Sequence, residues 1–155
     1  MQPSRRKKIR LGPEIYRIVG LPCFVTIATK EKEKIFSHQH LAKDFVDLLR
    51  RICEQNNIPL YAYCIMPDHT HLLLRASETK GIIEFVREMK SLSTKAAWQH
   101  GYRGNIWQRS FYDHFLRQDE DCRTVANYIV RNPVIDGIVG DWKDYPFSGS
   151  FVYEL

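Results

Sequence analysis

The chain has 155 residues with 44% hydrophobic and 26% charged residues, a composition that fits one globular domain and excludes disordered and low-complexity classes. No apolar run approaches the roughly 20 residues that cross a bilayer, and the N-terminus lacks the apolar core of a signal peptide. We therefore expect a cytoplasmic protein without a membrane partner. The four cysteines are scattered without a CxxC pair, so we expect them to be reduced and structural.

The net charge of +5 is concentrated in a basic N-terminal arm, residues 1–12, ahead of a single domain over residues 13–155. A second biased stretch, from Met89 to Tyr112, contains no Asp or Glu and carries aromatic residues such as Trp98, Tyr102 and Trp107. Cations interleaved with aromatic rings suit stacking on bases beside a phosphate backbone. A solvated tail and a solvated helix face with core aromatics are the alternatives. The candidate DNA-contacting cations are Arg5, Arg6, Lys7, Lys8, Arg10, Lys90, Lys95, Arg103 and Arg109.

The first half of the chain predicts a strand, a helix and a hairpin. Residues 22–29 are rich in β-branched and aromatic residues, as expected for a strand. Ser37 can cap a helix over residues 38–55, where apolar residues recur at helical spacing. Residues 58–66 and 69–76 then form two strand-like runs joined by a tight turn.

The second half predicts a helix over residues 80–100, an aromatic strand over residues 106–117 and a last helix over residues 119–131. Asp119 can cap the last helix, and Pro133 terminates it. This order of elements is typical of an α+β, ferredoxin-like (split βαβ) fold. We expect an antiparallel sheet with helices on one face and an added C-terminal helix.

Two histidines separated by one residue are the main chemical signal. On a strand, His69 and His71 share a face because side chains alternate with a period of two. They could therefore bind one metal ion, although two ligands alone leave a site incomplete. The second pair, His38 and His40, falls at a helix start, where the rings diverge, and we interpret it as solvated.

A tyrosine and an asparagine lie four residues apart in the last helix. Tyr128 and Asn132 would share a helical face with Val125 and Ile129 beside them. Core packing of the ring and a helix-terminal role for the amide are the ordinary explanations. A functional role requires this helix to cover the sheet face that carries the two histidines.

Three motifs in a fixed order give a specific resemblance. The segments PDHTHLLL, WQRSFYDHFLR and NYIVRNPV, with the tail DYPFSGS, resemble the single-tyrosine HUH transposases, in particular the REP-associated tyrosine transposase branch. The similarity spans residues 22–147. It implies that His69 and His71 are metal ligands, that Asn132 supplies a third ligand and that Tyr128 is the nucleophile. The sequence departs from the family pattern at Thr70, usually a bulky hydrophobe, and at Phe147, where Trp is common.

The resemblance also implies an activity. The enzyme would be a metal-dependent single-strand endonuclease and strand transferase that forms a 5′-phosphotyrosine intermediate. Its cofactor would be Mg or Mn, and its partner would be single-stranded DNA with REP-like hairpins. The protein would act as a monomer or a homodimer.

Other functions remain open at the level of sequence. The same order of elements describes RNA-recognition sheets, so a non-catalytic nucleic-acid-binding module is an alternative, although the aromatic signature of those sheets is absent. A phosphoesterase with paired His-x-Thr/Ser motifs lacks the required hydroxyl positions. A domesticated family member that nicks DNA without moving itself is not separable from an active transposase. His114 matches a recurrent family position, and we favour a core or supporting role for it.

Overall fold

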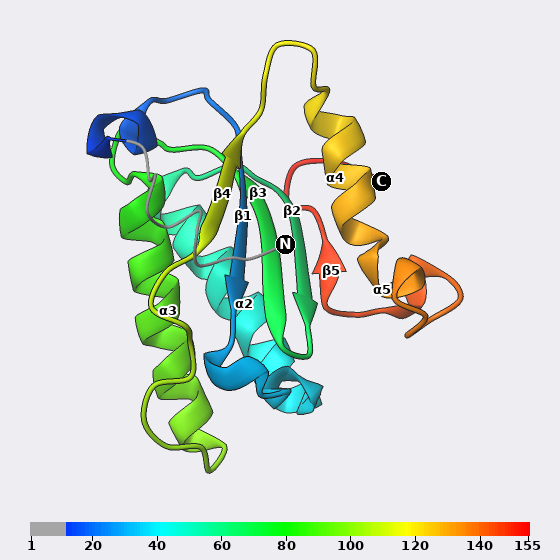
Figure 1. Cartoon of the computed structure of the whole chain (residues 1–155). Coiled ribbons are helices and arrows are strands. Elements are labelled where there is room, and N and C mark those ends of the chain that lie inside the picture. Colours follow the sequence, from blue (N-terminus) through cyan, green and yellow to red (C-terminus); the bar gives the residue numbers. More distant parts are fainter. Residues whose placement is uncertain (1–11) are drawn as a thin grey trace.

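The structure, a computed structural model, describes residues 12–155 (Figure 1). Arg5, Arg6, Lys7, Lys8 and Arg10 of the basic arm lie outside this range. The strands and α-helices are β1 (Cys23–Ala28), α2 (Gln39–Asn56), β2 (Leu60–Met66), β3 (His69–Leu74), α3 (Ile82–Gln99), β4 (Tyr112–Phe115), α4 (Cys122–Val130), α5 (Asn132–Ile135) and β5 (Ser148–Gly149). Short 3₁₀ helices are η1 (Pro13–Arg17), η2 (Lys30–Lys32), η3 (Ile35–Ser37) and η4 (Trp142–Asp144).

The five strands form one antiparallel sheet in the order β4-β1-β3-β2-β5. Its first four strands have the split βαβ order, which confirms the α+β, ferredoxin-like prediction. The two-residue strand β5 extends the sheet beside β2 and was not predicted. No helix in the described part of the chain is long and apolar enough to cross a membrane.

One face of the sheet forms the main hydrophobic core with α2 and α3 (Figure 1). Alternate residues of β1, Cys23, Val25 and Ile27, point into this core and are fully buried. Phe45 of α2 and Phe85 of α3 are also fully buried there. Alternation along the strands therefore sends every second side chain to the opposite face.

The opposite face carries α4, the added helix, over β2 and β3 (Figure 1). Ala126 and Ile129 of α4 are buried in a second hydrophobic cluster with Cys64 and Met66 of β2. The C-terminal segment fastens this layer, because the Tyr145 hydroxyl donates to the Ile65 carbonyl at 2.5 Å. The two helical layers thus sandwich the sheet.

The predicted strand over residues 106–117 is much shorter than expected. Only β4 is a strand, while Trp107 forms an isolated bridge with Thr29. The indole of Trp107 is 1% exposed, and its Nε1 donates to Ser93 Oγ at 2.9 Å. Trp107 is therefore a core residue, and the expectation that it could stack on bases is wrong.

Helix ends differ from the predictions in three places. His38, not Ser37, caps α2, because its Nδ1 accepts from the Leu41 amide at 3.3 Å. The ring centroids of His38 and His40 are 6.0 Å apart, so the expectation that these rings diverge is wrong. Asp121, not Asp119, caps α4. The last helix also does not run to Arg131, because α4 ends at Val130 and Asn132 starts α5.

Thr70 offers a test of how the core is packed. Its side chain is fully buried between Ile27 and Ile65, its cross-strand neighbours, and its hydroxyl has no hydrogen-bond partner among residues 12–155. A buried hydroxyl without a partner costs about 1–3 kcal/mol. We expect Thr70→Val, which keeps the shape, to raise the free energy of unfolding by about 1 kcal/mol in urea denaturation. Thr70→Ser, which keeps the hydroxyl, is the control, and a loss of stability in the valine variant would contradict this account.

Candidate active site

The two histidines of β3 lie next to each other on the face that carries α4. Their ring centroids are 4.7 Å apart, and the ring planes meet at 76°. Thr70, between them, points into the opposite core. The predicted alternation of the strand therefore does bring the imidazoles together.

Each imidazole is held through its Nδ1 atom. His69 Nδ1 lies 2.7 Å from Asp68 Oδ1, and since a carboxylate only accepts, His69 donates this hydrogen bond. His71 Nδ1 lies 2.9 Å from Thr26 Oγ1 on β1. When His71 donates to this hydroxyl, both histidines keep an Nε2 lone pair for a ligand. Such supporting bonds orient metal-binding histidines in proteins.

Burial also sets the protonation state of His71. It lowers the pKa of His71 to about 3, and the neighbouring His69 adds to the decrease. The His71 imidazole is therefore neutral near pH 7. A neutral imidazole is the form that binds a metal ion.

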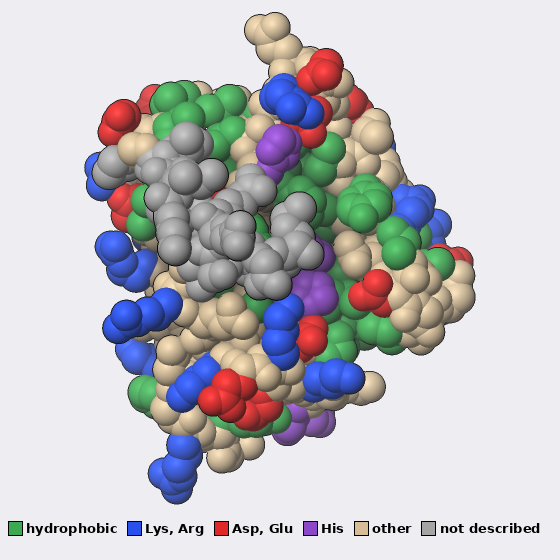
Figure 2. Space-filling view, viewed as in Figure 1, with side chains coloured by type: hydrophobic (Ala, Val, Ile, Leu, Met, Phe, Trp, Pro, Cys, Tyr) green, Lys and Arg blue, Asp and Glu red, His purple; other side chains and the backbone are tan. Residues whose placement is uncertain are grey.

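The histidines open into a pocket of about 220 Å³ between β1, β3 and the segment that leads into β4. Figure 2 shows histidine side chains reaching the surface near the middle of this face, with basic and hydrophobic side chains next to them. No local sequence pattern connects Lys32 or Tyr112 with the histidines: Lys32 lies in η2 after β1, and Tyr112 begins β4, which pairs with β1. The pocket is lined by Thr26, Ala28, Lys32, His69, His71, Gln108, Ser110, Phe111 and Tyr112.

Helix α4 lies directly beside the histidine pair. Cys64 and Met66, which contact α4, are the cross-strand neighbours of His71 and His69. The face requirement for a functional Tyr128 is therefore met. Tyr128 itself is 57% exposed on α4.

Helical spacing places Tyr128 away from the buried side of α4. Arg123 packs over the ring of Tyr153 in the C-terminal tail, on the outer side of the sheet beyond β2. Tyr128 follows Arg123 by five residues, which is about 140° around a helix of 3.6 residues per turn. Tyr128 also follows the buried Ala126 by two residues, about 200°, so it points away from the second hydrophobic cluster, as its exposure shows. Within residues 12–155 it forms no hydrogen bond with either histidine.

Asn132 does not share one continuous helix with Tyr128. Arg131 separates α4 from α5, and Pro133 occupies the first turn of α5 instead of ending a helix, a position that proline favours. The C-terminal end of α5 is close to β2. Burial is the main cause of the raised pKa of Cys64 in β2, and the charge of Asp136, which follows α5, raises this pKa further. Asn132 makes no side-chain hydrogen bond with the histidines in the described structure.

The donor set tests whether a metal ion fits. Among residues 12–155, no group of three or more His, Cys, Asp or Glu side chains is arranged to hold a metal ion. Two Nε2 atoms on a pocket wall therefore suit an ion that takes its remaining ligands from an amide, water or phosphate. This donor set fits an open site better than a closed structural zinc site.

His114 lies on the same sheet face but is engaged elsewhere. Its Nε2 is 2.8 Å from Glu120 Oε1, and the same carboxylate oxygen accepts from the Arg117 amide at 2.8 Å. These bonds hold the turn that leads into α4. Glu120 accepts hydrogen bonds from the backbone N–H of Arg117 and from the side chain of His114. Both lower the pKa of its carboxyl group, and the bond from Arg117 has the larger effect.

The basic residues of the acid-free stretch have different environments. The Lys90 ammonium donates to the Gln108 carbonyl at 2.8 Å, so it also supports the wall of the histidine pocket. Lys95, Arg103 and Arg109 are exposed. Arg109 lines a second pocket, about 250 Å³, next to the first.

Comparisons with known proteins identify the family. The sequence profile of the family described as Transposase IS200 like matches residues 20–132. A Haemophilus influenzae protein provisionally named a REP-associated tyrosine transposase is 31% identical over 136 residues, which cover 81% of this chain and 77% of that protein. The REP-associated tyrosine transposase of Escherichia coli K12 is 32% identical over 87 residues, which cover 56% of this chain and 51% of that protein.

A solved structure supports the same assignment. A REP-associated tyrosine transposase bound to a REP hairpin matches with a TM-score of 0.67 and 27% identity, covering 86% of this chain and 78% of that chain. The fold, the paired histidines on β3 and the matches in sequence agree with one another. The chain therefore belongs to the IS200-like transposase family.

Proposed function

We propose that this protein is a metal-dependent endonuclease and strand transferase that cuts hairpin-containing single-stranded DNA through a phosphotyrosine intermediate. The observation that carries the proposal is the histidine pair on the sheet face under α4. Each Nδ1 atom is engaged by a neighbour, and both rings line one pocket. The family assignment supports a transposase role, and the chemistry below is argued from this chain's residues.

The metal-binding residues would be His69 and His71 through Nε2, with Asn132 supplying an amide oxygen. The proposed ion is Mg or Mn, with the amide oxygen and with water or phosphate oxygens in the positions that the histidines leave open. When bound, the ion would withdraw charge from a non-bridging phosphate oxygen and orient the phosphate. Asp68 and Thr26 would keep the two imidazoles in the tautomer and orientation that this requires.

Tyr128 would act as the nucleophile. Its Oη atom attacks the phosphorus, the new bond is the tyrosyl ester, and the bond from phosphorus to the 3′-oxygen breaks. The phenol loses its proton to solvent, which its exposed position allows, and the leaving 3′-oxygen gains one. The ester conserves the bond energy, so rejoining to a new 3′-hydroxyl needs no ATP.

The pocket favours a single strand as the substrate. A phosphate must enter a space of about 220 Å³ beside the histidines, and a flexible strand can bend into it where a rigid duplex is hindered. Lys32 on the pocket wall and exposed Arg109 nearby supply positive charge for the strand. The hairpin bound by the solved relative makes a folded single strand the substrate to test first.

A cleavage assay separates this function from a non-catalytic binding module. Single-stranded hairpin oligonucleotides are incubated with the protein, with and without Mn or Mg, and resolved on a denaturing gel. The proposal expects a covalent protein–DNA band that depends on the metal. A binding module would retain the DNA in a native gel and give no covalent band.

The nucleophile can be tested by removing one hydroxyl. We expect Tyr128→Phe to abolish the covalent adduct while DNA binding and the melting temperature stay unchanged, because the exposed hydroxyl has no hydrogen bond in the described structure. Tyr112→Phe is the matched control, since Tyr112 also lines the histidine pocket. An adduct that survives in Tyr128→Phe and disappears in Tyr112→Phe would transfer the role to Tyr112.

Substitutions of the proposed metal ligands should reduce cleavage more than substitutions of the residues that orient them. We expect His69→Ala or His71→Ala to abolish metal-dependent cleavage. Asp68→Ala should weaken apparent metal affinity by about 10- to 100-fold and regain activity at high Mn concentration, because it only orients His69. Asp68→Asn, which keeps an accepting oxygen, should lose less. Full activity of His69→Ala in excess chelator would refute metal dependence.

The basic arm can be tested by its salt dependence. For single strands, the slope of log binding constant against log salt is about −0.7 per phosphate contacted. We expect deletion of residues 1–10 to weaken binding and flatten this slope, with metal-dependent cleavage retained at saturating DNA. A slope unchanged by the deletion would show that the arm makes no phosphate contacts.

A further inference from the structure

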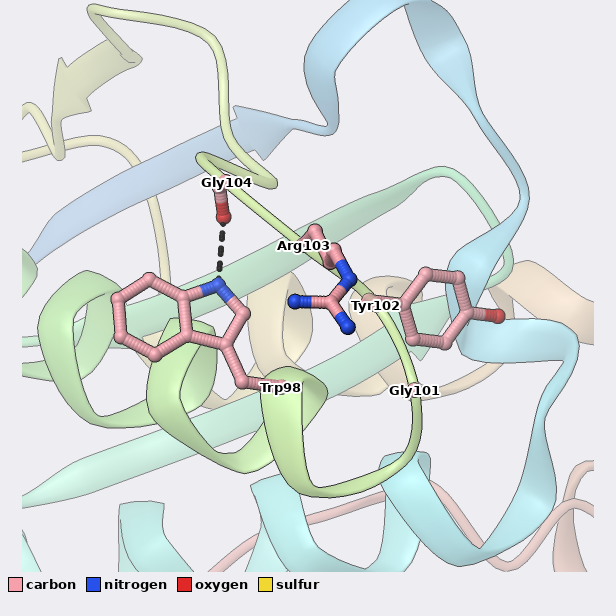
Figure 3. Close-up of a pocket in the computed structure, with 5 residues that line it drawn as sticks. All are labelled: Trp98, Gly101, Tyr102, Arg103 and Gly104. Carbon is pink, nitrogen blue, oxygen red and sulfur yellow. Dashed lines mark hydrogen bonds between the residues drawn. The ribbon is translucent and has the colours of Figure 1, made fainter.

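A separate pocket lies at the C-terminal end of α3, away from the histidine pair. This Trp98 pocket has a volume of about 270 Å³ and is lined by Trp98, Gly101, Tyr102, Arg103 and Gly104 (Figure 3). Its size is just below the roughly 300 Å³ at which pockets for drug-sized ligands begin. A single aromatic base is therefore a better match than a large ligand.

The indole of Trp98 is exposed but fixed in orientation. Its side chain is 50% exposed, and its Nε1 donates to the Gly104 carbonyl at 2.8 Å (Figure 3). Gly101 and Gly104 both have positive φ angles, +95° and +69°, which let the loop fold back over the helix end. A ring already held in place loses little entropy when another ring stacks on it.

The charge around the Trp98 pocket favours an anionic occupant. Figure 3 shows the Arg103 side chain projecting between the indole of Trp98 and the ring of Tyr102. Arg103 is exposed and forms no ion pair with any residue in the 12–155 range, and Lys95 lies one turn before Trp98 on α3. The Asp44 carboxylate is already engaged, because its Oδ2 lies 2.7 Å from Nε2 of His100, the residue before Gly101.

We propose that the Trp98 pocket binds one unpaired nucleotide of the DNA strand, with its base stacked on Trp98 and its phosphate on Arg103. This inference rests on the proposed function and adds a base-binding position outside the catalytic pocket. Gly104 of the Trp98 pocket and Gln108 of the histidine pocket are four residues apart, at most about 14 Å along an extended chain. At about 3.4 Å per nucleotide of stacked strand, one strand can reach both pockets with a few nucleotides.

The experiment measures binding without chemistry. A fluorescently labelled dT16 oligonucleotide is titrated, in excess chelator, into the full-length Tyr128→Phe protein and into versions with pocket substitutions. Stacking on one aromatic side chain is worth about 1–3 kcal/mol, so Trp98→Ala should weaken binding about 5- to 150-fold. Arg103→Gln should weaken it and flatten the salt slope by about 0.7. Trp142→Ala is the tryptophan control and should bind like the parent.

Intrinsic fluorescence gives a second readout. DNA should quench the fluorescence of the Trp142→Phe variant, which retains Trp98, and most of the quenching should disappear in Trp98→Phe. Equal binding by the parent, Trp98→Ala and Arg103→Gln would overturn the inference, as would quenching that persists in Trp98→Phe. Near-UV circular dichroism identifies any variant that has failed to fold, and Arg103→Gln then remains as the test, because its side chain makes no hydrogen bond within residues 12–155.

The outcomes also separate this inference from the proposed function. Loss of affinity in the Trp98 variants without metal-dependent cleavage by the unmodified protein would refute the nuclease and leave the nucleotide pocket standing. Cleavage that proceeds with unchanged affinity in Trp98→Ala would refute the pocket and leave the nuclease standing.

Discussion

Strand β3 is hydrogen-bonded on both sides, to β1 and to β2, and this double pairing decides the face on which every β3 side chain lies. Because strand side chains alternate, a slip of one residue would turn both histidines into the main core and expose Thr70. That change would bury two imidazoles among leucine and isoleucine side chains without partners. The hydrophobic residues of β3, buried on both faces, hold the register that the histidines depend on.

The same pairing supplies the histidines with their supports. Thr26 reaches His71 because it is the cross-strand neighbour of that residue in β1. Asp68 reaches His69 because it is the last residue of the tight turn between β2 and β3, directly before His69. The candidate site is therefore built on paired strands, and its geometry is as rigid as the sheet. Rigid elements are the places where ligand geometry is best maintained.

Much of this arrangement could be predicted from the sequence because its signals are local. Alternation on a strand placed His69 and His71 on one face, and helical spacing placed Ile129 toward the sheet. The support from Thr26, 45 residues before His71, depends on register, which no local pattern reveals. The burial of Trp107 depends on Ser93 in another element, and the acid-free composition around it gave the opposite expectation. The start of α2 was predicted incorrectly for a related reason. His38 caps this helix with its imidazole, and histidine is not among the residues that usually cap helices.

The two hydrophobic clusters divide the molecule into parts of unequal strength. The histidines are carried by a sheet that the large cluster with α2 and α3 stabilises, whereas α4 rests on the smaller cluster and on bonds from the C-terminal segment. Local opening of a protein begins where the fewest apolar contacts must be broken. The helix that carries Tyr128 therefore rests on fewer apolar contacts than the strands that carry the histidines. Local opening of this kind would change the distance between Tyr128 and the histidines without disturbing the paired strands.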